Sequence, residues 1–550
     1  MWITKTRAIL LFLLVFLAST CSGATNSAPL RKQLKILAIF GHPGKSHFDV
    51  FKPLVEELAR RGHGVTVISH FPRTEKAIAA EPLPTYKDIS LVDENLGVFV
   101  NVVDLNLIDN SYTRIFKNMY MLYFMSNISC TIGLQNAAVK QLLASGQKFD
   151  VLLTESFNTN CFMGLVYRIN APFIQISTHQ LMPWVIDELG LSQETSYVPA
   201  LLTRLPKPMN LFERMSNLAA TWFMSAMFHT FFDWRDRSLI EKNYGPGTPD
   251  LQSISNNASL IFVNTHYTIH GSTSYQQNVI EIGGLHIPPS VKPLPKNIAK
   301  FLDEAHEGVL YFNLGSMVKT SSMPKDKLDV LLKVLGSIPR KVIWKWEADD
   351  MPDLPSNIFI LKWLPQYDIL NHPNVRCYFG HGGLLGLSEG VQSGVPMVLM
   401  PFFGDQYQNS MAARARGVAV MLDYAQLSEE TVRHALDEVF NNTSFTFSGT
   451  SRSEGYGYPA SDAMNLERRE CQGYRCEYSV LYRDDNGPGD GGNEKVESRP
   501  LISPALINDS YVAQRYAGTN LSRSQANPTP KSVGYHELLV SMVGDAAWMQ

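Results

Sequence analysis

The residues best suited to carry chemistry gather between positions 363 and 406 of the chain. A glycine-rich turn, His381-Gly382-Gly383, follows a predicted strand at Val375–Phe379 and opens a predicted helix. The free backbone N–H groups and the positive dipole end at such a turn bind anions. The sequence therefore predicts a phosphate site at this turn, with His381 as an additional hydrogen-bond donor.

Five further side chains around this turn could complete a site for a nucleotide that carries a sugar. An indole can stack on a base, an amide can hydrogen-bond to it, a helix carboxylate can accept from ribose hydroxyls, and a polar pair after the next strand can grip sugar hydroxyls. Trp363 supplies the indole, Gln366 the amide, Glu389 the carboxylate, and Asp405 with Gln406 the polar pair. Singly, such residues are more often a core tryptophan, a capping histidine or a solvated helix charge. Their joint spacing favours a ligand site.

A second glycine-containing turn follows the first predicted strand, at residues 41–46. Its ending, Gly44-Lys45-Ser46, looks like the end of a P-loop, but a Walker A motif needs a further glycine at position 39, which is Ile39. Without that glycine the phosphate cradle cannot form, so an NTPase is disfavoured. Three histidines of this region are assigned structural roles: His42, His63 and His70.

These turns lie in a chain of the α/β class. From residue 35, short β-branched or apolar runs alternate with longer amphipathic ones, the pattern of parallel sheets with crossover helices. The expected organisation is a first domain at 25–282, a Pro-rich linker at 283–296, a second domain at 297–442 and a largely disordered, Gly- and Ser-rich tail at 443–550. In doubly wound sheets ligands bind beyond the carboxyl ends of the strands, so a shared substrate would lie in the cleft between two Rossmann-like domains.

Length and composition exclude several classes of protein. The 550 residues allow about two to four domains. With 45% hydrophobic and 18% charged residues, the chain is too apolar for a disordered protein and not apolar enough for a multispan membrane protein. Its 48 basic and 51 acidic residues give a net charge of −3 without a long basic run, which argues against a nucleic-acid partner.

The N-terminus predicts a secretory signal peptide over residues 1–24. Lys5 and Arg7 precede an apolar run from Ala8 to Ala18, which is too short to span a bilayer, and small residues follow it. Several Asn-x-Ser/Thr triplets are compatible with a secretory route. One of the six cysteines leaves with the signal, and the odd number that remains has no metal-ligand spacing. This pattern predicts neither a disulfide scaffold nor a zinc site.

One apolar segment, Met215–Phe232, stands outside the α/β pattern. It contains no Asp, Glu, Lys or Arg and reaches about the minimum length of a spanning helix. Polar residues dilute it, so a buried or substrate-facing helix is favoured over a transmembrane one. Association with a membrane surface is a third alternative.

Taken together, Trp363-Leu364-Pro365-Gln366, the run from His381 to Glu389 and the run from Pro401 to Gln406 closely resemble the signature of the family 1 UDP-glycosyltransferases. The Leu-Leu-Gly after His-Gly-Gly is most similar to the insect branch. The resemblance covers roughly Leu34 to Asn442. It implies a GT-B architecture, an N-terminal acceptor domain, a C-terminal donor domain, a UDP-sugar as donor substrate, no permanently bound cofactor and no required metal.

The resemblance also implies roles for individual residues. Trp363 and Gln366 would hold uracil, Glu389 the ribose, and Asp405 with Gln406 the sugar. The diphosphate would be held by Ser316, His381, Gly383 and Gly386. In one place the sequence departs from the family pattern: the motif histidine usually follows Ser or Thr, but here it follows Gly380. The missing hydroxyl donor is worth about 1 kcal/mol of UDP affinity.

In the first domain the Ser46-His47 pair matches the family's catalytic histidine, so His47 is expected to act as the general base. An imidazole with a pKa near 6.5 can take the proton of an acceptor hydroxyl as the oxygen attacks the anomeric carbon. Displacement from the opposite face inverts that carbon. A carboxylate normally orients such a histidine. Glu155 is the predicted partner, because Asn160, where insect relatives often carry Asp, cannot supply a charge.

The expected activity is transfer of a hexose, glucose by resemblance to the insect branch, to a hydroxyl of a small lipophilic alcohol or phenol. Two alternatives remain: a non-catalytic relative that binds a lipophile or a UDP-sugar, which Gly380 and Asn160 favour, and an epimerase on the same architecture. Family members usually continue beyond Asn442 with a bridging helix, a membrane anchor and a basic tail, and this sequence shows none of these. The expected location is therefore the endoplasmic reticulum lumen or outside the cell, with peripheral membrane contact as an option.

Overall fold

The computed structural model describes residues 33–92, 100–107 and 114–441, so the predicted signal peptide and the predicted tail lie outside the described residues. The first half of the chain forms a seven-stranded parallel sheet with the order β3-β2-β1-β5-β6-β7-β8. Its strands are fully buried at the centre, as expected for a parallel sheet covered on both faces. They are β1 (Lys35–Phe40), β2 (Gly64–Ser69), β3 (Tyr86–Ser90), β5 (Val151–Glu155), β6 (Phe173–Ser177), β7 (Leu260–Val263) and β8 (Val279–Glu281).

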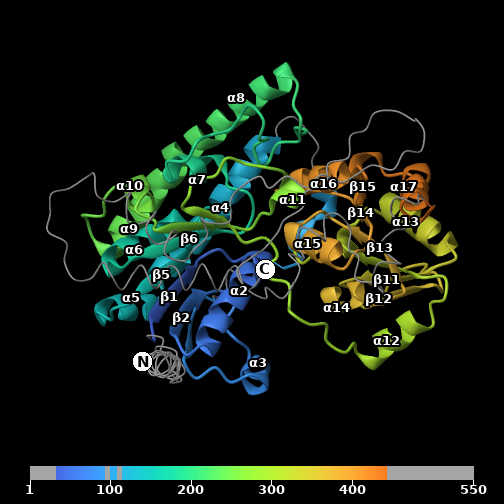
Figure 1. The fold of residues 1–550 in the computed structure, drawn as a ribbon, viewed down its shortest axis with the longest axis horizontal. Coiled ribbons are helices and arrows are strands. Elements are labelled where there is room, and N and C mark those ends of the chain that lie inside the picture. The colour runs from blue at the N-terminus through green and yellow to red at the C-terminus, as the bar shows by residue number, and fades with distance from the viewer. Residues whose placement is uncertain (1–32, 93–99, 108–113, 442–550) are drawn as a thin grey trace, which may run out of the picture.

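Helices pack on both faces of this first sheet (Figure 1). One of them, α2 (Lys45–Arg60), turns its apolar residues toward the strands at helical spacing. The others are α3 (Glu75–Ala80), α4 (Arg114–Gln135), α5 (Ala137–Ala144), α6 (Met163–Ile169), α7 (Pro183–Glu188), α8 (Leu211–Met227), α9 (Asp233–Tyr244), α10 (Leu251–Ser255) and α11 (Tyr267–His270).

The second half forms a six-stranded parallel sheet with the order β12-β11-β9-β13-β14-β15. Its strands are β9 (Val309–Asn313), β11 (Lys341–Lys345), β12 (Ile358–Leu361), β13 (Val375–Gly380), β14 (Met397–Leu399) and β15 (Ala419–Met421). Its helices are α12 (Lys296–Asp303), α13 (Lys325–Ser337), α14 (Gln366–Leu370), α15 (Leu384–Gln392), α16 (Gln406–Ala415) and α17 (Glu429–Asn441). The predicted fold class, α/β with two doubly wound domains, is confirmed.

A short segment of the first half crosses over to the second. β4 (Val103–Asp104) pairs in parallel with β10 (Val318–Lys319), and Leu105, which follows β4, is buried in the core of the second domain. The two halves also meet at α16, where the guanidinium of Arg204 lies 3.7 Å from the ring centre of Tyr407. The domains therefore contact each other through backbone pairing, apolar packing and cation–π stacking.

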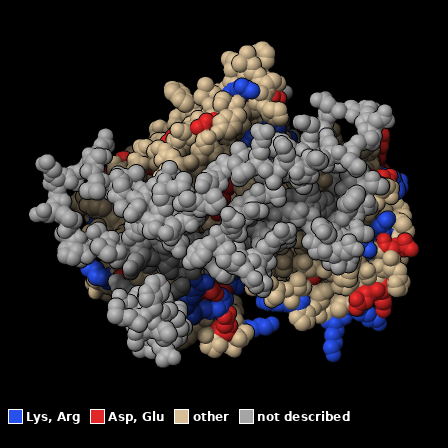
Figure 2. Space-filling model, viewed as in Figure 1, with Lys and Arg blue, Asp and Glu red and all other residues tan. Residues whose placement is uncertain are grey.

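The uncharged segment Met215–Phe232 forms most of α8 and a π-helical turn at Phe228–Phe232. Its inner residues are buried, but Met215, Leu218 and Trp222 on the outer face are 60%, 53% and 77% exposed. The prediction of a buried helix is therefore wrong for this face. Burial of one stripe of side chains is enough to hold α8 on the domain, so the opposite face can stay exposed. Figure 2 shows few charged side chains over this upper part of the molecule. Within the described residues, no helix combines the length and apolarity that crossing a membrane requires.

Cys130 on α4 and Cys161, just before α6, form a disulfide bond. The sequence predicted no disulfide scaffold, and this pair was missed, because two cysteines 31 residues apart carry no spacing signal. Cys377, on β13, is a buried free thiol. The bond ties α4 to the segment that follows β5, the strand that ends at Glu155.

Candidate functional site

Both sheets have a topological switch point, and four of the predicted site residues end or follow the strands at these two points: His47, Glu155, Ser316 and His381. In the first sheet β1 stands between β2 and β5, so the connections that leave β1 and β5 diverge. In the second sheet β9 stands between β11 and β13 and creates the same divergence. Crevices outside the carboxyl ends of strands at such points are where doubly wound domains bind ligands.

His47 and Glu155 meet at the switch point of the first sheet. His47 lies on the first turn of α2, just after the β1 turn, and Glu155 is the last residue of β5. Their side chains approach to 2.6 Å between Nδ1 and Oε1, and the hydroxyl of Thr178 lies 3.1 Å from the same nitrogen. With Nδ1 engaged, the other ring nitrogen, Nε2, is the one left for a ligand.

Burial dominates the electrostatics of this pair. It raises the pKa of the Glu155 carboxyl to about 7. It also lowers the pKa of His47 well below 6.5, and the neighbouring imidazole of His179 lowers it further. The rings of His42 and Phe157 pack against His47, with centroids 4.4 and 4.8 Å away. The imidazole is therefore neutral at pH 7, and it lies among two other imidazoles, the Glu155 carboxyl and the Phe157 ring.

The Asn160 side chain forms its hydrogen bond with a group other than His47. Its side-chain amide donates to Oε1 of Glu188, which is buried at the end of α7. Burial raises the pKa of the Glu188 carboxyl, and the charge of Asp233 raises it further. Asn160 thus supports a buried polar group, and the structure brings Glu155, not Asn160, to the histidine.

The turn that the sequence predicts to bind phosphate, His381-Gly382-Gly383, is called the phosphate turn below. It lies after β13 and packs against the loop that follows β9. Gly315 has φ +85°, a conformation that favours glycine, and a Cβ there would lie 2.6 Å from the ring of His381. A Cβ on Gly383 would lie 2.4 Å from the same ring. The two glycines let the imidazole lie between the loops that carry Ser316 and the start of α15.

His381 is a neutral hydrogen-bonding group. Burial and, to a smaller extent, the positive charge of Lys345 lower its pKa to about 4. At pH 7 the ring can therefore donate an N–H to a ligand but carries no positive charge.

Gln366 and Glu389 belong to one partly buried hydrogen-bond network. The Gln366 amide donates to Oε2 of Glu389 over 2.7 Å, and its oxygen accepts from the Tyr311 hydroxyl and the Asn313 amide. Burial raises the pKa of Glu389 to about 7, while the bond from Gln366 lowers it. The Gln366 side chain is therefore committed to protein partners, whereas the sequence interpretation directed it to a base. Gln366 thereby orients the Glu389 carboxyl.

The structure explains why position 380 holds a glycine instead of the family's serine or threonine. Tyr378 lies two residues earlier on β13 and on the same face, and a Cβ on Gly380 would lie 2.7 Å from its ring. Its hydroxyl also lies 2.5 Å from the Cβ position of Gly386. The tyrosine fills the space that a serine or threonine side chain would need at position 380.

The remaining predicted residues lie around the turn. Trp363 is 64% exposed, so its ring is free to stack on a base. Gln406 is buried, and its oxygen accepts from two backbone N–H groups of the preceding loop. Asp405 accepts from Asn409 over 2.8 Å, and the same amide donates to the carbonyl of Gly382. The sequence analysis missed Asn409, which ties Asp405 to the phosphate turn; its i+4 position on α16 was the available signal.

The two switch points face each other. Leu385 of α15 packs against the core of the first domain, and the negative charge of Asp49, two residues beyond His47, acts on Glu389. The start of α2 therefore lies near the start of α15 (Figure 1). A ligand held at the phosphate turn would extend toward His47.

Residues 37–448 match the family model described as UDP-glucoronosyl and UDP-glucosyl transferase. The chain belongs to this family. It is 33% identical over 441 residues to UDP-glucosyltransferase 2 of Dactylopius coccus, which covers 80% of this chain and 82% of that protein. It is 28% identical over 439 residues to the ecdysteroid UDP-glucosyltransferase of Spodoptera littoralis nuclear polyhedrosis virus, covering 76% and 83%. The chain is a glycosyltransferase with a UDP-sugar as donor.

Solved glycosyltransferases resemble this transferase more distantly. The structure of SnogD from Streptomyces nogalater is 16% identical, covers 79% of this chain and 99% of its own, and has a TM-score of 0.46.

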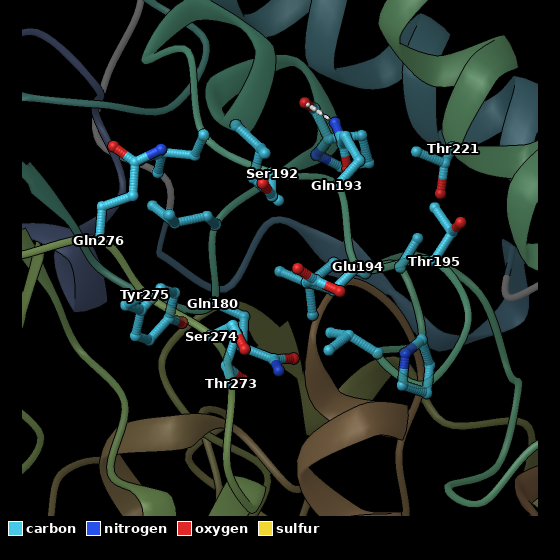
Figure 3. Close-up of a pocket in the computed structure, with 18 residues that line it drawn as sticks. Gln180, Ser192, Gln193, Glu194, Thr195, Thr221, Thr273, Ser274, Tyr275 and Gln276 are labelled. Carbon is cyan, nitrogen blue, oxygen red and sulfur yellow. Dashed lines mark hydrogen bonds between the residues drawn. The ribbon is translucent and has the colours of Figure 1, made fainter.

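A pocket next to the histidine site has an empty volume of about 620 Å³, including its open mouth (Figure 3). Gln180 and Leu181 lie on one wall, directly after Thr178 and His179. Thr221 of α8 and Tyr275 contribute other parts of the lining. The sequence analysis assigned no residues to this pocket, because loops that converge only in the fold leave no local motif.

Among the described residues of the transferase, two groups of side chains lie close enough to hold a metal ion. In the first, Cys130 and Cys161 are joined to each other. In the second, His229 bonds to Asp233 over 2.9 Å, and hydrogen bonds to Asp187 and Asp233 raise the pKa of the imidazole to about 10. A protonated imidazole is an ion-pair partner rather than a ligand.

Proposed function

We propose that this transferase moves a hexose, glucose in the first instance, from a UDP-sugar to a hydroxyl of a small lipophilic acceptor with inversion at the anomeric carbon, and that His47 is the general base. The observation that carries the proposal is the His47–Glu155 contact of 2.6 Å at the switch point that faces the phosphate turn. Ionised Glu155 accepts the Nδ1 proton of His47, which leaves the Nε2 lone pair for the acceptor hydroxyl.

The donor would lie across the second domain. Trp363 would stack on uracil, Glu389 would accept from the ribose hydroxyls, and Ser316, His381, Gly383 and Gly386 would surround the diphosphate. Asp405, oriented by Asn409, and Gln406 would bind the sugar. As the sugar–phosphate bond breaks, backbone N–H groups at the start of α15 and the N–H of neutral His381 would stabilise the charge of the leaving UDP.

The acceptor would occupy the pocket of Figure 3, which Gln180 lines, and the space between that pocket and His47. Leu181, Ile186 and Leu201 line that pocket and favour an apolar acceptor body. Phe157, which packs on His47, would contribute to the same apolar surface near the reacting hydroxyl.

Two features support a secretory location with contact to a membrane surface. A disulfide between Cys130 and Cys161 is expected in an oxidising compartment such as the endoplasmic reticulum lumen. The outer face of α8 exposes Leu218 and Trp222 without a charge between them, which suits an apolar surface such as a bilayer interface.

The test is turnover by the purified full chain with UDP-glucose and a panel of phenols and lipophilic alcohols. A β-linked glucoside from the α-linked donor would support the proposal. UDP-glucose binding without any product would favour a non-catalytic binding protein, a role for which Gly380, with its missing hydroxyl donor, is the specific argument. Isomerisation of the sugar would indicate an epimerase.

A further inference from the structure

A crossing segment, residues 100–107, runs from the acceptor domain onto the loop that follows β9. The backbone N–H of Asn101 donates to the carbonyl of Ser316 over 2.8 Å, and the N–H of Val103 donates to the carbonyl of Met317 over 2.9 Å. Leu105 then anchors the segment, since its side chain is 2% exposed in the core of the second domain. A segment of the acceptor domain therefore fixes the backbone of the proposed diphosphate loop.

The Asn101 side chain contacts a buried cation at the same place. Lys345 ends β11, the neighbour of β9, so it lies at the same edge of the sheet as Ser316. It is 3% exposed, and its ammonium group donates to Oδ1 of Asn101 over 3.2 Å and to Oε1 of Glu347 over 2.8 Å. A buried lysine needs such partners, and Glu347 is itself held by the backbone N–H of Ser321.

The charge of Lys345 reaches the phosphate turn. It acts on His381, which lies against Gly315 and is itself uncharged at pH 7. A diphosphate that departs from a sugar gains negative charge, and a fixed positive charge nearby stabilises that charge in a buried site. Lys345, although paired with Glu347, therefore adds a positive charge near this turn, whereas His381 is neutral.

We propose that Lys345 is the positioning and electrostatic residue for the donor diphosphate, and that Asn101 of the acceptor domain holds it in place. The inference rests on the diphosphate position given under the proposed function. Asn101 contacts both the Ser316 backbone and Lys345. Donor affinity therefore depends on a residue of the domain that binds the acceptor.

The experiment compares UDP with uridine on the full-length chain by calorimetry, for the wild type, Lys345→Met, Lys345→Arg and Asn101→Gly. Uridine lacks the phosphates, so the ratio of the two affinities isolates the effect on the diphosphate. Lys345→Met should weaken UDP binding about tenfold and uridine binding less than twofold, and Lys345→Arg should restore most of the loss. Asn101→Gly, which keeps the φ of +53°, should weaken UDP binding about threefold.

Lys319→Met, which removes an exposed lysine of β10, is the matched control and should change neither affinity. Equal loss of UDP and uridine affinity in Lys345→Met, with no rescue by arginine, would mean a structural role and overturn the inference. Wild-type affinities for both ligands in Lys345→Met would overturn it as well. A wild-type chain that bound no UDP would instead refute the proposed function on which the inference rests.

Discussion

The Oε1 atom of Glu155 lies 2.6 Å from Nδ1 of His47, although 108 residues separate them in the chain. The pair forms because β1 and β5 are neighbours in the first sheet, and the residues that leave their carboxyl ends meet at one edge. The carboxylate decides which ring nitrogen carries the proton, and therefore whether His47 can accept one from a substrate.

The protonation of Glu155 should set the pH below which kcat/KM declines. Burial raises its pKa to about 7, so it is ionised above that pH and protonated below it. Protonated Glu155 would donate to Nδ1, and the proton of neutral His47 would then lie on Nε2, where no base remains. We expect kcat/KM in the wild type to fall about tenfold per pH unit as the pH drops below about 7.

Glu155→Gln is the matched variant for this pH dependence. Its rate should be low throughout and lack the inflection near pH 7, while UDP affinity stays unchanged. An inflection that persists in Glu155→Gln would assign the titration to another group.

Trp363 should affect ligand binding and leave stability unchanged, because its ring is already 64% exposed. Trp363→Ala removes a stacking surface worth about 1–3 kcal/mol per base, so UDP affinity should fall at least about fivefold. The unfolding midpoint should not move. Trp222→Ala on α8 is the control, since that ring is 77% exposed but lies outside the site, and it should alter neither quantity. Unchanged UDP affinity in Trp363→Ala would remove the uracil assignment.

Gly380 should not tolerate the hydroxyl residue that the family usually carries. In Gly380→Ser the new Cβ would meet the Tyr378 ring at 2.7 Å, and β13 is buried on both sides. The free energy of unfolding should fall by about 1–3 kcal/mol, as for other overpacked cores. Chemical denaturation measures it. A variant with wild-type stability and tighter UDP binding would show that Tyr378 can move aside.

The Cys130–Cys161 bond should contribute to stability through the 31-residue loop that it closes. In the chain-entropy account such a loop is worth about 3–4 kcal/mol. The double variant Cys130→Ser and Cys161→Ser should lose about that much in urea unfolding. Dithiothreitol should destabilise the wild type but leave the double variant unaffected. Equal sensitivity of both proteins to the reductant would mean that the bond contributes nothing.

Much of the fold followed from the sequence because central parallel strands are buried on both faces and form continuous apolar runs. β13, predicted at Val375–Phe379, has those bounds in the structure except that it ends one residue later, at Gly380. β3 was missed because it is an edge strand with mixed burial. The two-residue β4 was missed because it is a strand only through its pairing with β10 in the other domain.

The candidate site was predictable as a set of positions but not as a set of contacts. A glycine-rich turn after a strand reports a backbone conformation, which is local, so the phosphate turn could be placed. The direction of the Gln366 side chain depends on Glu389 of α15 and on Tyr311 and Asn313 of β9, two elements far from it in the chain. The links from Asn101 to Ser316 and Lys345 join different domains, and no sequence pattern reports them.

The most direct test of the account is the turnover of His47→Ala against its UDP affinity. The account predicts that kcat falls by about 10²–10⁴, the usual contribution of a general base, because only the deprotonation of the acceptor hydroxyl is lost. UDP affinity, measured by calorimetry on the same preparation, should stay within twofold of the wild type, since the phosphate turn lies in the other domain. A His47→Ala enzyme that retained most of its kcat would contradict the assignment of His47 as the base.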